Sequence, residues 1–187
     1  TDADPDEAKL EERIARLSDR LKAMVADHDR PNNSLEARTS LLVIEVNQAA
    51  LKKDPQRLSS LWPQFSEVIK QANGLGEFAA ERLTRMIEVF GNVAGKDQGY
   101  TRLVDDVAAF VSERTGEAQG ALVLLRRAQQ LDFEDNFEMI RLLGKAARQL
   151  TKKEYADALI ETMQLLTLAY RSAGLLWPAR ASCIFAM

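Results

Sequence analysis

The chain has 187 residues, of which 46% are hydrophobic and 28% charged, and its formal net charge is -3. This acidic balance argues against a dedicated nucleic-acid-binding protein, because contacts to phosphates need a clear surplus of Lys and Arg. The single cysteine excludes an internal disulfide. No membrane span is predicted, because the chain has no uninterrupted run of 18 apolar residues. The acidic N-terminal segment is unlike a signal peptide, so a cytoplasmic location is expected.

Helices are predicted along the whole chain, beginning with one over about 4–26 that carries the heptad pattern discussed below. Pro31 disfavours helix at the residue before it, so a break is expected there, and a second helix follows over 35–53. The third helix begins at Pro55 after an aspartate cap. Pro63 is expected to kink or split this third helix, since proline removes a backbone donor from the helix interior.

Six further helices complete the expected set. The seventh is predicted to be capped by Asp132, and the eighth by a capping box of Thr151 and Glu154. In chain order, the six are expected over about 77–93, 98–114, 117–131, 133–150, 151–172 and 175–187. No segment alternates apolar and polar residues over a useful length, so no sheet is expected. The predicted fold is all-α, with about nine helices in antiparallel pairs that form an α-solenoid or an irregular helical bundle.

The stretch AYRSAGLLWPARA places an aromatic residue, a glycine and an alanine at offsets of four and five, at Tyr170, Gly174 and Ala179. A second, partial match has a turn glycine and two alanines at Gly116, Ala121 and Ala128. This pattern resembles the turn of the tetratricopeptide repeat, over roughly residues 97–187. The resemblance implies a solenoid of helix pairs, with small residues where the two helices of a pair touch.

The first helix carries apolar residues spaced four, three, four and three apart, at Leu10, Ile14, Leu17, Leu21 and Met24. This spacing is typical of a coiled-coil seam. The flanking positions offer no pair of opposite charges, which favours docking of the helix on its own chain. A homodimer and an outside partner remain alternatives. Residues 1–30 are therefore expected to form a separate amphipathic segment, ahead of a helical domain over 31–187 that belongs to a longer chain.

Residues suited to catalysis are scarce. The chain has one histidine, His28, whereas a di-iron bundle site of the Glu-x-x-His type needs two. Cys183 lies among apolar residues and is expected to be a buried, inert thiol. Asp105 and Asp106 are adjacent on a helix, point about 100° apart, and are interpreted as solvated charges. No enzyme activity, metal or cofactor is therefore predicted.

Two surface features suggest binding. The first is a set of four cations spaced four, three and four apart, at Arg141, Lys145, Arg148 and Lys152. They are interpreted as one stripe on the seventh helix, either an ordinary solvated face or a clamp for an acidic peptide or a C-terminal carboxylate. The second is the apolar end of the chain, at Leu176, Trp177, Ile184 and Phe185. It is expected to need covering by a partner or by further chain.

These patterns predict a non-enzymatic helical scaffold or interaction module that mediates protein–protein contacts inside a larger intracellular protein. The alternative is a homodimeric structural or regulatory bundle assembled through the N-terminal helix. The expected partner is a protein or peptide, with neither nucleic acid nor membrane involved.

Overall fold

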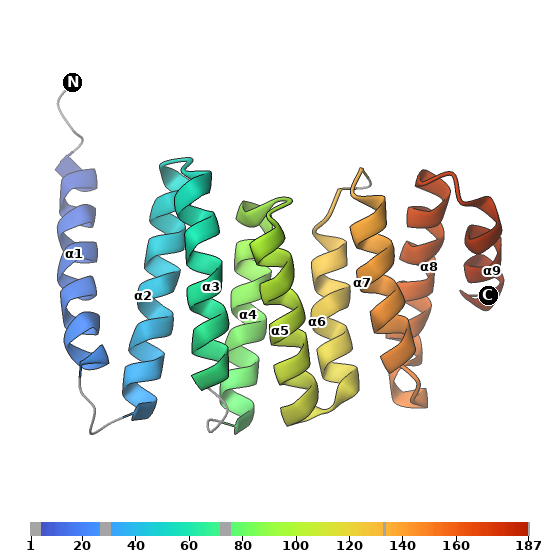
Figure 1. Ribbon diagram of the computed structural model, residues 1–187, viewed down its shortest axis with the longest axis horizontal. Coiled ribbons are helices and arrows are strands. Elements are labelled where there is room, and N and C mark those ends of the chain that lie inside the picture. The colour runs from blue at the N-terminus through green and yellow to red at the C-terminus, as the bar shows by residue number, and fades with distance from the viewer. Residues whose placement is uncertain (1–4, 27–30, 72–75, 133, 187) are drawn as a thin grey trace. The chain divides into compact units, whose positions relative to one another are not determined.

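In the computed structural model, the chain is all-helical (Figure 1), which confirms the predicted fold class. The structure describes residues 5–26, 31–71, 76–132 and 134–186, and no strand occurs in these ranges. A single-turn 3₁₀ helix, η2 (Lys153–Tyr155), precedes the eighth α-helix. The α-helices of the described residues are α1 (Pro5–Val25), α2 (Pro31–Leu51), α3 (Pro55–Gln71), α4 (Gly76–Ala94), α5 (Gln98–Thr115), α6 (Glu117–Gln129), α7 (Asn136–Gln149), α8 (Ala156–Ser172) and α9 (Leu176–Ala186).

The chain divides into two compact units, Thr1–Leu75 and Gly76–Met187. The division falls at a different place from the boundary expected near residue 30. In the first unit α1 packs against α2, and α2 packs against α3, so the N-terminal helix belongs with its two successors.

Helix α3 runs through Pro63 as one continuous helix rather than two. Pro63 faces solvent, whereas Leu61, Trp62 and Phe65 are buried. Burial of a large apolar side chain contributes about 1.5–3 kcal/mol, and the internal proline costs about 3 kcal/mol. Packing of these three side chains therefore offsets the cost of the proline and keeps the helix intact.

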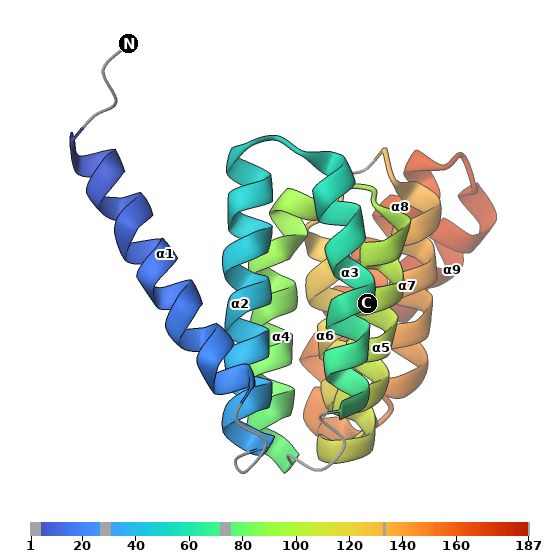
Figure 2. The same cartoon turned by 60° about the vertical axis from the view of Figure 1, so that its left-hand side comes forward.

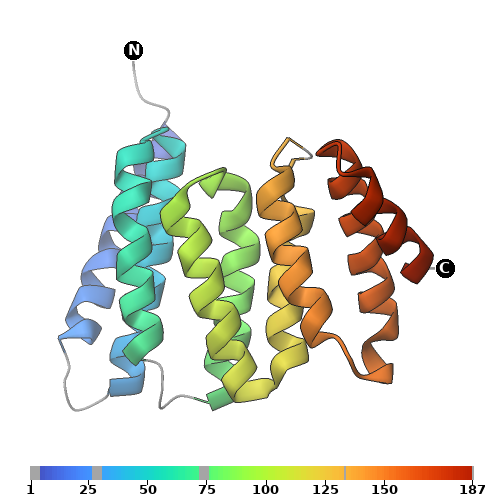
Figure 3. The ribbon, with the colours of Figure 1, turned by 45° about the vertical axis from the view of Figure 1, so that its right-hand side comes forward.

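The second unit consists of two layers of helices (Figure 3), with α4, α6 and α8 in one layer and α5, α7 and α9 in the other. Each helix packs against the next one along the chain. The first residues of alternate helices lie 38 to 41 positions apart, at Gly76, Glu117 and Ala156 in one layer and Gln98, Asn136 and Leu176 in the other. This spacing is longer than the 34 residues of a tetratricopeptide repeat and closer to the roughly 40 residues of other α-solenoid units.

Small residues allow α5 and α6 to approach closely. A Cβ atom added to Gly120 would overlap the Ser112 hydroxyl and lie 2.5 Å from the Ala108 carbonyl oxygen. Ala121 and Ala128 of α6 are also fully buried. Small residues of this kind let neighbouring helices approach closely where they cross.

Several helix ends differ from the predicted ones. Helix α2 begins at Pro31 itself, because the fixed φ angle of proline suits the first helical position. Helix α7 begins at Asn136, four residues after the predicted Asp132 cap. Helix α8 begins only after η2 and shows no side-chain cap, so the predicted capping box is wrong. Leu150, which directly follows α7, is fully buried, and the residues after it lead to η2.

Candidate functional site

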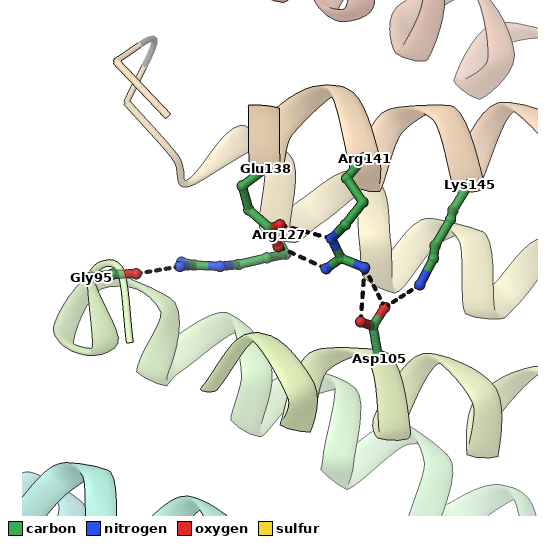
Figure 4. Close-up of polar contacts among 6 residues, drawn as sticks. All are labelled: Gly95, Asp105, Arg127, Glu138, Arg141 and Lys145. Carbon is green, nitrogen blue, oxygen red and sulfur yellow. Dashed lines mark hydrogen bonds and ion pairs between the residues drawn. The ribbon is translucent and has the colours of Figure 1, made fainter. Parts of the chain in front are cut away.

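Two of the cations of α7, Arg141 and Lys145, are paired with carboxylates. Arg141 donates to both carboxylate oxygens of Asp105, at 3.0 and 2.8 Å, and to both of Glu138, at 2.7 Å each (Figure 4). Lys145 donates to Asp105 Oδ1 at 2.8 Å. Asp105 belongs to α5, so these bonds join two helices of one layer. Asp105 is therefore not the solvated charge that the sequence suggested.

This cluster balances its own charge. The hydrogen bonds to Glu138 are the main reason that the pKa of Arg141 rises above its ordinary value, and burial acts in the opposite direction. Two cations face two carboxylates, because Arg141 and Lys145 meet Asp105 and Glu138. Little net positive charge is left there for an acidic ligand.

The other two cations of the predicted stripe are separated. Helix α7 ends at Gln149, so Lys152 lies beyond it, 4.0 Å from the carboxylate of Glu154. The prediction that Lys152 belongs to one stripe of four cations on the seventh helix is therefore wrong. Arg148 remains on α7 and is exposed. It borders a hollow of about 290 Å³ lined by α5, α6 and α7, together with Asp105 and Lys145.

A larger groove, about 580 Å³ in volume, lies over α4, α5 and α6. Its charged lining residues carry both signs: Glu81 and Arg85 from α4, and the ion pair of Glu88 with Arg126. Because acids and bases alternate along it, the groove favours no ligand of one charge.

A buried arginine joins α6 to the end of α4. Arg127 is only 3% exposed, and its guanidinium donates to the carbonyl oxygens of Gly91 and Gly95 at 2.9 and 2.6 Å (Figure 4 shows the bond to Gly95). The same group lies 4.9 Å from the centre of the Tyr100 ring. The Tyr100 hydroxyl in turn donates to the Ile87 carbonyl oxygen at 2.6 Å.

Burial accounts for the electrostatics of this arginine and its tyrosine. It lowers the pKa of Arg127 from the ordinary value, and the electrostatic interaction with Tyr100 acts in the opposite direction. It raises the pKa of Tyr100, against the effect of Arg127. The pair is packed against carbonyls at the C-terminal end of α4, where the helix dipole favours a cation. This is a structural contact, and the sequence analysis did not single it out.

Helix α9 leaves most of its apolar side chains in solvent. Trp177 is 81% exposed, Leu176 69%, Phe185 61% and Ile184 59%. Among the described residues of α9, only two small side chains, Ala179 and Ser182, are buried. The helix therefore packs through a narrow strip, and Cys183 lies outside that strip. This thiol is exposed, so the expectation of a buried cysteine is wrong.

Helix α1 lies against α2 near the connection between them and leans away toward its own N-terminus (Figure 2). Ile14 and Leu21 are half-buried, whereas Leu17 and Met24 are exposed. Of the four seam residues whose side chains the structure describes, two thus remain exposed. The side chain of Leu10 and all of His28 lie outside the described residues.

Within the described part of the chain, no group of three His, Cys, Asp or Glu side chains is placed to hold a metal ion. No helix among those residues is long and apolar enough to cross a membrane. The chain matches no family model, no curated protein and no solved structure.

Proposed function

We propose that this chain is a non-enzymatic helical scaffold, which binds a partner protein through the exposed apolar surface of α9. The observation that carries the proposal is the exposure of Leu176, Trp177, Ile184 and Phe185 on one helix of eleven residues. Apolar side chains scattered singly over a surface are ordinary, but a concentration of large ones is typical of an interaction site.

The large apolar side chains of this surface can contribute substantially to binding. Full burial of a large apolar side chain contributes about 1.5–3 kcal/mol, and aromatic residues are frequent among the side chains that dominate interfaces. Trp177 and Phe185 supply two such anchors. The α7 cluster is a weaker candidate, because Asp105 and Glu138 already occupy Arg141 and Lys145. An acidic peptide would meet Arg148 as the exposed cation of α7.

Site-directed photo-crosslinking tests the proposal in cells that make the native gene product. A benzophenone amino acid in place of Arg180, which is exposed on α9, should give one discrete adduct with another protein. The double variant Trp177→Glu, Phe185→Glu should lose that adduct. The matched control carries the same probe in place of Arg102, which is exposed on α5, and should give no adduct. No adduct at Arg180, or one that survives the double variant, would contradict the proposal.

The alternative function, a homodimeric structural or regulatory bundle joined through α1, is supported by the exposure of Leu17 and Met24. The double variant Leu17→Glu, Met24→Glu would then convert a dimer into a monomer, as measured by light scattering. A cytoplasmic location and membership of a larger protein complete the proposal. Both are tested by localising the tagged native gene product and measuring its mass.

A further inference from the structure

The outer face of α8 carries a symmetric pattern of side chains. Five exposed residues, Asp157, Ile160, Gln164, Leu168 and Arg171, lie within an arc of about 80° on the helix. The buried residues of α8, which are Thr162, Leu166 and Ala169, lie on the opposite side. The five therefore form one continuous solvent-facing strip, here called the α8 strip.

The α8 strip is symmetric about Gln164: at equal distances on either side it has apolar residues at one pair of positions and residues of opposite charge at the other. Ile160 and Leu168 lie four positions before and after it, and Asp157 and Arg171 lie seven positions before and after it. In an antiparallel pair of identical helices related by a two-fold axis at Gln164, each residue faces its mirror position. Ile160 then meets Leu168 of the other copy, and Asp157 meets Arg171.

We propose that the α8 strip pairs two copies of this chain as an antiparallel, two-fold symmetric dimer. Such an interface uses the same patch on both subunits, so the patch must be complementary to itself. The α8 strip meets this requirement with an apolar centre and two ion pairs of opposite charge. A different partner protein would not require the pattern to be symmetric about one residue.

The members of the α8 strip are available for this contact. Ile160 is 39% exposed and Leu168 is 45% exposed. Neither Asp157 nor Arg171 forms an ion pair within the part of the chain that the structure describes. From Asp157 to Arg171 the helix rises about 21 Å, at about 1.5 Å per residue. A contact of this length on one helix is small, so a weak dimer is expected.

Charge reversal and mixing test the dimer. Analytical ultracentrifugation of the 187-residue chain should show a concentration-dependent dimer. Asp157→Lys and Arg171→Glu, each alone, place like charges opposite each other at both ends of the strip, and each should weaken dimerisation by about tenfold. When the two variants are mixed in equal amounts, both ends again join opposite charges, so a mixed dimer should form with parental affinity.

Two controls separate pairing from folding. Glu113→Lys changes an exposed charge on α5 and should dimerise like the parent. Both strip variants should keep the parental thermal midpoint, and restoration on mixing cannot arise if either one is unfolded. A monomeric parent would overturn the inference. So would single variants that dimerise like the parent, or a mixture that stays monomeric.

This inference stands apart from the α9 proposal, because it uses a different helix face and a different occupant. If position 180 crosslinks to another protein while the chain is monomeric in the ultracentrifuge, the α9 proposal is supported and the α8 dimer is contradicted. If position 180 gives no adduct while the chain dimerises as described, the α9 proposal is contradicted and the α8 dimer is supported.

Discussion

Arg127 should be the polar side chain whose loss most destabilises the second unit. Replacing it by Met keeps the length and much of the apolar stem but removes both donors. The Gly91 carbonyl then loses the guanidinium as a donor, and water cannot replace it because Gly91 is buried. Gly95 is exposed, so its carbonyl can bind water instead. Lys at this position keeps the charge but cannot form the two-pronged contact or stack flat on Tyr100.

The magnitude follows from these contacts. A hydrogen bond to a charged group contributes about 1.5–3 kcal/mol, and a partly desolvated cation–π contact contributes about 1–2 kcal/mol. The desolvation of the buried guanidinium, which a methionine avoids, offsets part of that sum. A net loss of about 2–4 kcal/mol is expected for Arg127→Met. For Arg127→Lys, the expected loss is about 1–2 kcal/mol, because one hydrogen bond survives.

Urea unfolding followed by circular dichroism at the helical band measures this loss directly. In a chain of this size each 1 kcal/mol lowers the thermal midpoint by about 2–4 °C, so Arg127→Met should melt about 4–16 °C below the parent. The matched control is Arg126→Met, because the neighbouring arginine is half-exposed and pairs with Glu88 at the surface. It should cost less than about 1 kcal/mol. Equal losses for the two arginines would refute the reasoning.

Three further outcomes are expected. Gly120→Ala should lower the free energy of unfolding by about 1–3 kcal/mol, because a Cβ there meets the Ala108 carbonyl of α5, and a parental urea midpoint would show that the helices separate freely. Ala121→Leu should cost a similar amount by overpacking a fully buried site, and an unchanged melting curve would place the residue on the surface. Cys183 should react with a thiol reagent in the native state as fast as in urea, and protection until unfolding would contradict its exposure.

The sequence was sufficient to predict the helices because apolar residues recur with helical spacing between Gly and Pro breaks. It was weaker on where helices begin. Asp97 caps α5 as a local signal should, accepting from the backbone amides of Gly99 and Tyr100 at 2.7 and 3.2 Å. Asp132 and Thr151 have the same local chemistry but do not start a helix. Tertiary packing overrides such a local signal there, and that packing depends on residues far along the chain.

The α9 side chains could be singled out from the sequence because their apolar character is local to one short segment. The pairing of Arg141 with a carboxylate of another helix could not be predicted from the sequence. This pairing depends on Asp105, which lies 36 positions earlier, and on the distance between α5 and α7. The spacing of residues within one helix gives no information about that distance. The same limit hid Arg127, whose carbonyl partners lie 36 and 32 positions away.

Polar bridges between alternate helices recur through the second unit, and they explain why the apolar surface of α9 stands out. Arg126 on α6 pairs with Glu88 on α4, Gln129 on α6 donates to Glu161 on α8 at 2.7 Å, and Arg141 on α7 binds Asp105 on α5.

Each of these bridges uses a polar or charged side chain of one helix to hold the next helix of its layer. Helix α9 has a single charged residue, Arg180, and no acid, so it has little with which to extend this pattern. Its large exposed side chains are instead mainly apolar, namely Leu176, Trp177, Ile184 and Phe185, and their removal from water by another apolar surface is favourable. Contact with another apolar surface would therefore stabilise this helix more than contact with solvent does.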